Sequence, residues 1–94
     1  MRPKESVIED YLVDRVKATG GEVRKQAWPG HKGSPDRFCW WPNGRHAWIE
    51  LKRPGGAPEA HQAREIAKMR RAGLAVLAID NKIAIDIFVD QMTA

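Results

Sequence analysis

The sequence contains one cysteine, Cys39, and no apolar run long enough to cross a bilayer. A single cysteine cannot form a disulfide within the chain, and the histidines show no spacing typical of a zinc site. The charged first residues are not followed by the apolar segment of a signal peptide. These absences exclude a disulfide framework and a membrane span, argue against a soft-metal site, and predict a soluble protein of a reducing cytoplasm.

The chain is also short, and it lacks internal repeats and low-complexity segments. Its 94 residues can bury only one core, so we expect a single domain over residues 1–94. With 43% hydrophobic and 30% charged residues, it is too apolar for a disordered chain.

Acidic residues are scarce in the middle of the chain. The net charge is +4, and between Val23 and Arg53 the only acids are Asp36 and Glu50. The basic residues of this stretch are Arg24, Lys25, Lys32, Arg37, Arg45, Lys52 and Arg53. A central basic excess predicts a phosphate-bearing partner such as nucleic acid.

Glycine and proline divide the chain into short elements. In chain order we expect a helix over 5–18, strands over 22–27, 36–41 and 46–52, a helix over 58–72 and a strand over 74–79. The last strand is apolar throughout, so we expect it to be buried on both faces. Residues 81–92 fit a strand or a helix, and we favour a helix.

This order predicts an α/β domain with a mixed sheet between layers of helices. Strand 74–79 follows a crossover helix and should pair in parallel with an earlier strand. Trp40 and Trp41 are neighbours on a strand and must face opposite ways. One should lie in the core, and dimerisation would cover the other.

One group of charged residues indicates chemistry. Glu50 and Lys52 alternate on one strand and therefore project from the same face, and Asp36 lies at the start of the neighbouring strand. Two carboxylates can share a hard divalent cation, which phosphodiester hydrolysis uses to offset negative charge. Lys52 would orient the attacking water or neutralise the transition state, and Arg53 would hold a backbone phosphate. The alternative is a surface Glu–Lys pair with a turn aspartate.

At Pro35-Asp36 and Glu50-Leu51-Lys52 the chain resembles the PD-(D/E)XK nuclease superfamily. More narrowly, it resembles the stand-alone virus-type replication-repair nuclease (VRR-NUC) domains common in phages. The similarity also includes Ile8-Glu9, Gly20-Gly21, Pro29-Gly30, Arg37, Arg53-Pro54-Gly55, Gln62 and Ala72-Gly73. It covers residues 5–79 and implies an αβββαβ core with a metal-dependent phosphodiesterase activity.

The resemblance makes Asp36 and Glu50 metal carboxylates for Mg²⁺ or Mn²⁺, with the carbonyl of Leu51 as a further ligand. Lys52 becomes the catalytic lysine. Gln62 would support the lysine or its water, although a buried amide could also satisfy a loop carbonyl.

A carboxylate on the first helix usually completes the site in this superfamily. Glu5 and Glu9 fall within the same helical stripe, so periodicity does not choose between them. We favour Glu9, acting directly or through water, because it lies a full turn inside the helix. Its distance to Gly20 also resembles that in archaeal Holliday-junction resolvases.

Several residues are expected to contact DNA: Lys25, His31, Lys32, Ser34, Arg37 and Arg53. Trp28, in the same loop as His31, would either stack on an unpaired base or fill the core.

We therefore predict a Mg²⁺- or Mn²⁺-dependent DNA endonuclease of the host or infected cell. It would act as a homodimer on branched DNA such as four-way (Holliday) junctions. One rival is a catalytically weak nucleic-acid-binding module, which the intact Asp36, Glu50 and Lys52 argue against. The other is a sequence-specific restriction-type endonuclease, for which the sequence shows no base-reading motif.

Overall fold

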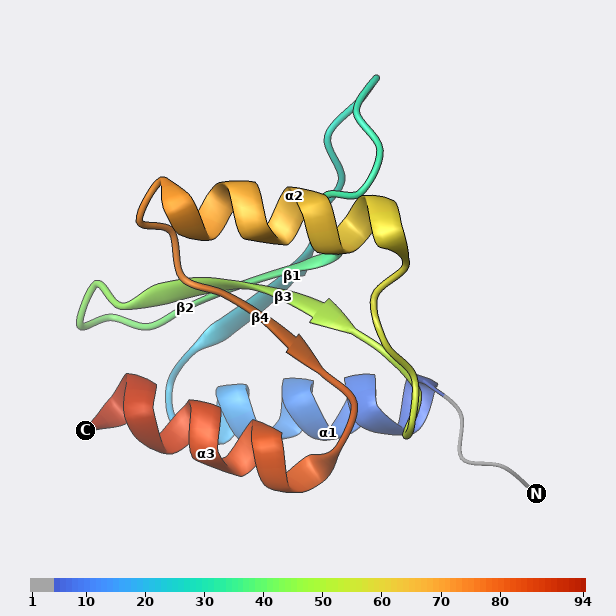
Figure 1. The fold of residues 1–94 in the computed structure, drawn as a ribbon. Coiled ribbons are helices and arrows are strands. Elements are labelled where there is room, and N and C mark those ends of the chain that lie inside the picture. Colours follow the sequence, from blue (N-terminus) through green and yellow to red (C-terminus); the bar gives the residue numbers. More distant parts are fainter. Residues whose placement is uncertain (1–4) are drawn as a thin grey trace.

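The computed structural model describes residues 5–94 (Figure 1). Its elements are α1 (Glu5–Ala18), β1 (Glu22–Lys25), β2 (Arg37–Trp40), β3 (His46–Leu51), α2 (Ala60–Arg71), β4 (Val76–Ile79) and α3 (Lys82–Thr93). All the expected elements are present, with ends that shift by a few residues. The ambiguous last segment is a helix, because the Asn81 side chain accepts a hydrogen bond from the Ala84 amide and caps its first turn.

The sheet has the strand order β1-β2-β3-β4. The pairs β1–β2 and β2–β3 are antiparallel, whereas β4 joins β3 in parallel after the α2 crossover. The predicted mixed sheet and parallel last strand are confirmed. The antiparallel β2–β3 hairpin sets the start of β2 beside the end of β3, and this is where Asp36 and Glu50 lie in the chain.

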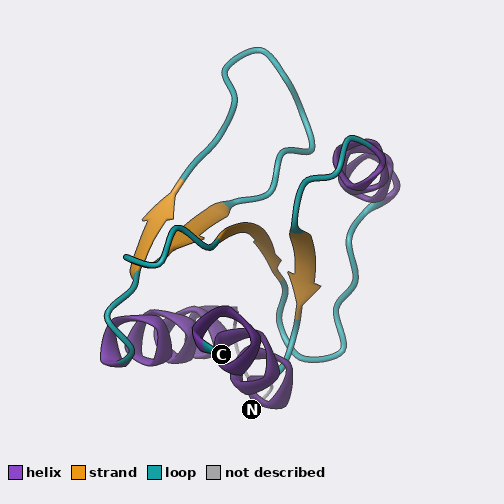
Figure 2. Cartoon of the chain, turned by 90° about the vertical axis from the view of Figure 1, so that its left-hand side faces the viewer, coloured by secondary structure: helices purple, strands orange, loops and turns teal. Residues whose placement is uncertain are grey.

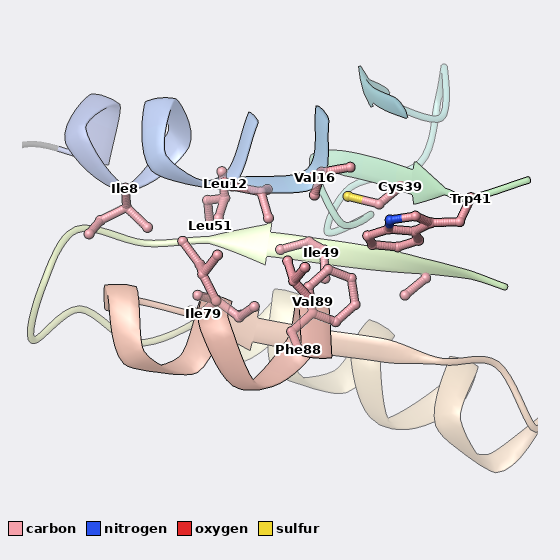
Figure 3. Packing of buried hydrophobic residues seen from close by; sticks show 12 residues of the cluster. Ile8, Leu12, Val16, Cys39, Trp41, Ile49, Leu51, Ile79, Phe88 and Val89 are labelled. Carbon is pink, nitrogen blue, oxygen red and sulfur yellow. The ribbon is translucent and has the colours of Figure 1, made fainter. Parts of the chain in front are cut away.

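Helices α1 and α3 cover one face of the sheet and α2 lies on the other, which gives the three predicted layers (Figures 1 and 2). The main core forms where α1, β3 and α3 meet (Figure 3), with Leu12, Ile49, Leu51, Phe88 and Val89 almost fully buried. A smaller cluster lies beneath α2, and it contains Ile66, Met69 and Val76 with the partly buried Trp28 and Trp48.

The prediction that strand 74–79 is buried on both faces is wrong. Val76 and Ile79 are buried, but Leu77 is only partly buried, Ala78 is exposed and Leu74 is 39% exposed. The reason is the strand order, because β4 is an edge strand. Helix α2 covers only part of the β4 face that carries Val76.

Trp40 and Trp41 face opposite ways, as expected. The Trp41 side chain is in the core at 3% exposure, and its indole Nε1 donates to Thr19 Oγ1 at 3.0 Å. Gly21 makes room for this ring, since a Cβ there would lie 2.7 Å from Trp41 Nε1 and from Val16 Cγ1. Trp40 is partly buried on the other face, where the Arg24 guanidinium carbon lies 4.9 Å from the ring centroid. The cover for this second indole thus comes in part from the same chain.

Within residues 5–94, no helix is both long enough and apolar enough to cross a membrane.

Candidate active site

Asp36 lies directly before β2, and Leu51 ends β3 on the neighbouring strand. The Leu51 amide donates to Asp36 Oδ1 at 3.1 Å, which fixes this carboxylate against the backbone that follows Glu50. The hairpin therefore brings together the two carboxylates, which are separated in the sequence by β2, a turn and most of β3.

Glu50 is buried, with 3% exposure, on the face of β3 that carries α2. Its Oε2 accepts a hydrogen bond from Gln62 Nε2 at 2.9 Å and lies 3.4 Å from Lys52 Nζ. Its Oε1 is buried without a hydrogen-bond partner among residues 5–94. Burial raises the pKa of Glu50, the nearby charge of Asp36 raises it further, and Lys52 lowers it. A buried carboxylate oxygen without a donor, beside a second carboxylate, is an arrangement that a cation would stabilise.

Lys52 follows β3 and lies on the same side as Glu50, as the strand alternation predicts. Its backbone amide donates to the Ile79 carbonyl at 2.9 Å, so the Lys52 backbone is hydrogen-bonded to the end of β4. The lysine side chain is 20% exposed and lines a cavity of about 140 Å³ together with Pro58 and Asp80. Its ammonium group is thus held beside the Glu50 carboxylate, while part of the side chain remains accessible to solvent.

Gln62 occupies the first turn of α2, and both ends of its amide are engaged. Its Oε1 accepts from the Glu59 amide at 2.9 Å, which is one half of a capping box. This bond turns the Gln62 amide nitrogen toward Glu50. Its acceptor in the structure is the Glu50 carboxylate rather than a loop carbonyl.

The two candidate acids of α1 have different surroundings. Glu9 forms an ion pair with the Arg37 guanidinium and lies 3.8 Å from Lys25 Nζ. Glu5 is exposed, and its charge is one of the causes that raise the pKa of Glu50. Figure 1 places the start of α1 at the same end of the molecule as the tip of β3. Glu5 therefore interacts electrostatically with Glu50, whereas Glu9 is ion-paired with Arg37.

Arg37 was expected on the DNA-binding surface, but its side chain is only 8% exposed. Its Nη1 donates to the Asp36 carbonyl at 2.9 Å and lies 3.5 Å from Asp36 Oδ2, while Nη2 binds Glu9. Its position supports a role in holding Asp36 and gives no support to a phosphate contact. The sequence contained a signal for this, because Arg37 shares a strand face with the buried Cys39.

The other expected DNA contacts lie on loops, except Lys25, which ends β1. Lys25, Lys32 and Arg53 are exposed, and Ser34 is partly buried. His31 is exposed, and its Nε2 lies 2.8 Å from Glu65 Oε2 of α2.

The loop formed by residues 26–36 is attached to α2. Besides the His31 contact, Trp28 packs against the small cluster beneath that helix, which is the core-filling alternative for this indole. Gly33 has φ of +91°, and a Cβ there would lie 2.9 Å from the His61 carbonyl oxygen. Only glycine allows the loop to approach α2 this closely while adopting this backbone conformation.

The side chains of the site offer oxygen ligands for a divalent cation. Among residues 5–94, no group of three or more histidine, cysteine, aspartate or glutamate side chains is arranged to hold a metal ion. Asp36 and Glu50 nevertheless supply two carboxylates, whose atoms available to a metal are all oxygen. Glu50 Oε1 accepts no hydrogen bond from residues 5–94. Two carboxylates with a backbone carbonyl and water fit Mg²⁺ or Mn²⁺, which keep several waters when bound.

An α/β domain with a carboxylate pair and a lysine at the ends of a β-hairpin has the architecture of a PD-(D/E)XK nuclease. A protein named "Putative nuclease p44", from Acyrthosiphon pisum secondary endosymbiont phage 1, is 38% identical over 79 residues, or 84% of this chain and 85% of that protein. A solved structure described as a VRR_NUC domain matches with a TM-score of 0.85 and 30% identity, over 94% of this chain and 96% of that chain. No family model matches the sequence.

The chain belongs to the VRR-NUC family of nucleases. The resemblance found in the sequence and the expected fold class are both confirmed.

Proposed function

We propose that this protein is a DNA endonuclease that hydrolyses phosphodiester bonds with Mg²⁺ or Mn²⁺. The observation that carries the proposal is the convergence of Asp36, Glu50 and Lys52, with Glu50 Oε1 buried and lacking a hydrogen-bond donor in the part of the chain that the structure describes. The phage relative named as a nuclease supports a substrate of nucleic acid and action inside an infected or host cell.

Each residue of the site has a distinct task in this proposal. Asp36, Glu50 and the Leu51 carbonyl would hold the cation, which when bound neutralises phosphoryl charge and lowers the pKa of water. Lys52 places a positive charge beside the scissile phosphate and orients the attacking water. Gln62 keeps the Glu50 carboxylate in position through its hydrogen bond.

The helix carboxylates are assigned according to their surroundings. Glu5 lies at the start of α1 and its charge raises the pKa of Glu50, so its exposed side chain would bind a metal-coordinated water. Glu9 acts through Arg37, whose guanidinium binds both Glu9 and Asp36. Glu9 is therefore a positioning residue, and its loss should affect the site through Asp36.

The proposed substrate is branched DNA, such as a four-way junction, and the proposed state is a two-fold homodimer. Two apolar side chains on α3 support dimerisation, because Ile83 is 73% exposed and Ile87 is 54% exposed. They are one helical turn apart and thus share one side of the helix. A two-fold dimer presents two equivalent sites to a junction of near two-fold symmetry, which allows paired incisions.

A cleavage panel tests the nuclease proposal. Purified protein is incubated with duplex, single-stranded, flap and four-way DNA in Mg²⁺, Mn²⁺ or EDTA. Wild type should cut only with metal, and Asp36→Asn, Glu50→Gln and Lys52→Ala should each lose cleavage while keeping the fold. Asp14→Asn, which changes an exposed acid of α1, is the matched control and should cut normally. Metal-independent cleavage, or normal cleavage by any of the three site variants, would refute the assignment.

A further inference from the structure

Four aromatic side chains form a connected group on the sheet face that carries Glu50. Phe38 and Trp40 come from β2, and His46 and Trp48 from β3; together we name them the aromatic surface. The ring centroid of Phe38 lies 4.9 Å from Trp48, 5.7 Å from Trp40 and 5.8 Å from His46. The rings of His46 and Trp48 are 5.9 Å apart. The cross-strand register accounts for this, because Phe38 pairs with Trp48 and Trp40 with His46.

Most of this surface is not part of either core cluster. Phe38 and Trp40 are partly buried but pack against neither the main core nor the cluster beneath α2, and His46 is exposed. Only Trp48 contacts the cluster beneath α2. Figure 2 shows why, since α2 lies above one edge of the sheet while two helices cover the opposite face. Large aromatic rings outside a core are typical of a binding surface.

A planar cation lies against one ring of this surface. The Arg24 guanidinium carbon lies 4.9 Å from the Trp40 ring centroid, so a planar cation extends the ring surface. The neighbouring acid, Glu22, lies 3.3 Å from Arg24 and is therefore paired. Unpaired bases stack on aromatic rings and on guanidinium planes, and the cation attracts the phosphates between them.

The surface is continuous with the candidate active site along one strand. His46, Trp48 and Glu50 alternate on the same face of β3, and a strand rises about 3.3 Å per residue. Trp48 is thus roughly 7 Å along the strand from Glu50. A nucleic-acid strand with one phosphate near Glu50 would have its following nucleotides along the aromatic surface, where Phe38 and Trp40 lie outside the cluster beneath α2.

We propose that the aromatic surface binds unpaired nucleotides of the substrate by base stacking, next to the scissile phosphate. This inference rests on the proposed endonuclease function and adds a substrate feature to it. Bases paired within a duplex are already stacked and cannot reach the rings. The protein would therefore prefer branched DNA that carries a single-stranded arm, such as a flap, over fully paired duplex.

Equilibrium binding in EDTA tests this proposal separately from cleavage. Labelled flap, single-stranded and blunt duplex DNA are titrated with wild type, Trp40→Ala and Phe38→Ala, and anisotropy is measured. Each alanine variant should weaken binding of flap and single-stranded DNA by roughly 5- to 100-fold and change duplex binding less than about twofold. Trp40→Phe keeps a ring and should restore most of the affinity. Val7→Ala, which shortens an exposed apolar side chain of α1 in the opposite layer, is the matched control.

Three results would overturn the proposal. Equal losses of affinity for duplex and single-stranded DNA would show that the rings do not select unpaired nucleotides. Unchanged affinity in the alanine variants would show that the rings do not contact nucleotides. Conversion of a dimer to a monomer by Trp40→Ala, seen by sedimentation, would identify a second copy of this chain as the occupant. Circular dichroism of both alanine variants checks that they fold. Failure of the nuclease proposal looks different, because wild type would then bind DNA in EDTA but not cut it with metal.

Discussion

Gln62 donates a hydrogen bond from Nε2 to Glu50 Oε2 at 2.9 Å, while its Oε1 caps α2 through the Glu59 amide. The same side chain therefore fixes the start of a helix and the position of a buried carboxylate. Because the Glu59 amide can only donate, the Gln62 amide has one possible orientation, with its NH₂ group toward Glu50. The helix terminus and the site are thus built together.

Replacing Gln62 with methionine should slow cleavage by about tenfold or more, since a charge-assisted hydrogen bond to Glu50 is lost. This bond favours the charged form of Glu50, so its loss should raise the already elevated pKa of Glu50 in the metal-free protein. A carbon-13 NMR titration of the Glu50 carboxyl group measures that pKa directly. Gln91→Met, an exposed position on α3, is the control. An unchanged pKa would mean that the bond does not persist in solution.

The two acids of α1 should respond differently to neutralisation. Glu5→Gln removes a charge that raises the pKa of Glu50, so this pKa should fall. Glu9→Gln leaves the Glu50 pKa nearly unchanged but weakens the Arg37 ion pair, which should loosen Asp36 and raise the metal concentration needed for half-maximal cleavage. Rates measured across a Mg²⁺ series, together with the NMR titration, separate the two effects. The reverse pattern would show that Glu9 faces the metal site.

Glu50→Gln should have opposite effects on stability with and without metal. Burial raises the Glu50 pKa in the folded state, so the folded protein binds this proton more tightly than the unfolded chain does. Ionisation of Glu50 therefore lowers the free energy of unfolding of the metal-free protein as pH rises from the unfolded pKa through the folded pKa. At pH values below the unfolded pKa this loss of stability is absent. At neutral pH the metal-free variant should be more stable than wild type, and the difference should shrink toward pH 4.

Adding Mg²⁺ should reverse that order. A cation that binds only the folded state raises the unfolding midpoint of wild type, and the variant should show little response because a ligand is missing. Thermal unfolding followed by circular dichroism measures both effects. It is recorded without metal and with Mg²⁺ at roughly 10 mM, so that the cation is in excess over the protein. Equal Mg²⁺ responses in the two proteins would place the cation elsewhere.

Much of this fold could be predicted because each element carries its own pattern. Apolar spacing in α1 and alternation in β3 indicate which side chains face the core, and alternation alone puts Glu50 and Lys52 on one face. Strand order is different, because it depends on contacts between elements. The sequence therefore did not show that β4 lies at an edge, or that Ala78 is exposed there.

The supporting residues of the site were harder to predict for the same reason. Helical periodicity puts Glu5 and Glu9 in one stripe, and only the position of Arg37 distinguishes them. Arginine is rarely buried unless it is paired, so the burial of Arg37 depends on partners that periodicity does not identify. Both of its partners come from parts of the chain that the fold brings together, namely α1 and the residue before β2.

Gly21→Ala should destabilise the fold by about 1–3 kcal/mol, because a new methyl group in a packed site forces neighbours to move. The added Cβ would lie 2.7 Å from Trp41 Nε1 and from Val16 Cγ1. Urea unfolding at neutral pH gives the free energy. Ala27→Gly, a change at an exposed loop position, is the control and should have a small effect. A Gly21→Ala protein as stable as wild type would show that the Trp41 indole can move away at little cost.

The proposed homodimer predicts a dependence on α3. Ile83 and Ile87 are exposed apolar neighbours on this helix, and burial of such side chains against a second copy would supply much of the association energy. Wild type at micromolar concentration should sediment with twice the 10.6 kDa mass of the chain. The double variant Ile83→Lys with Ile87→Lys should sediment as a monomer, because burying lysine charges without partners is costly.

Lys82→Ile, at a neighbouring exposed position, is a control for nonspecific effects of changing this helix. The monomeric variant should still cut flap DNA but lose paired incision of four-way junctions. A wild-type mass of 10.6 kDa, or paired incision by the lysine variant, would show that one subunit acts alone.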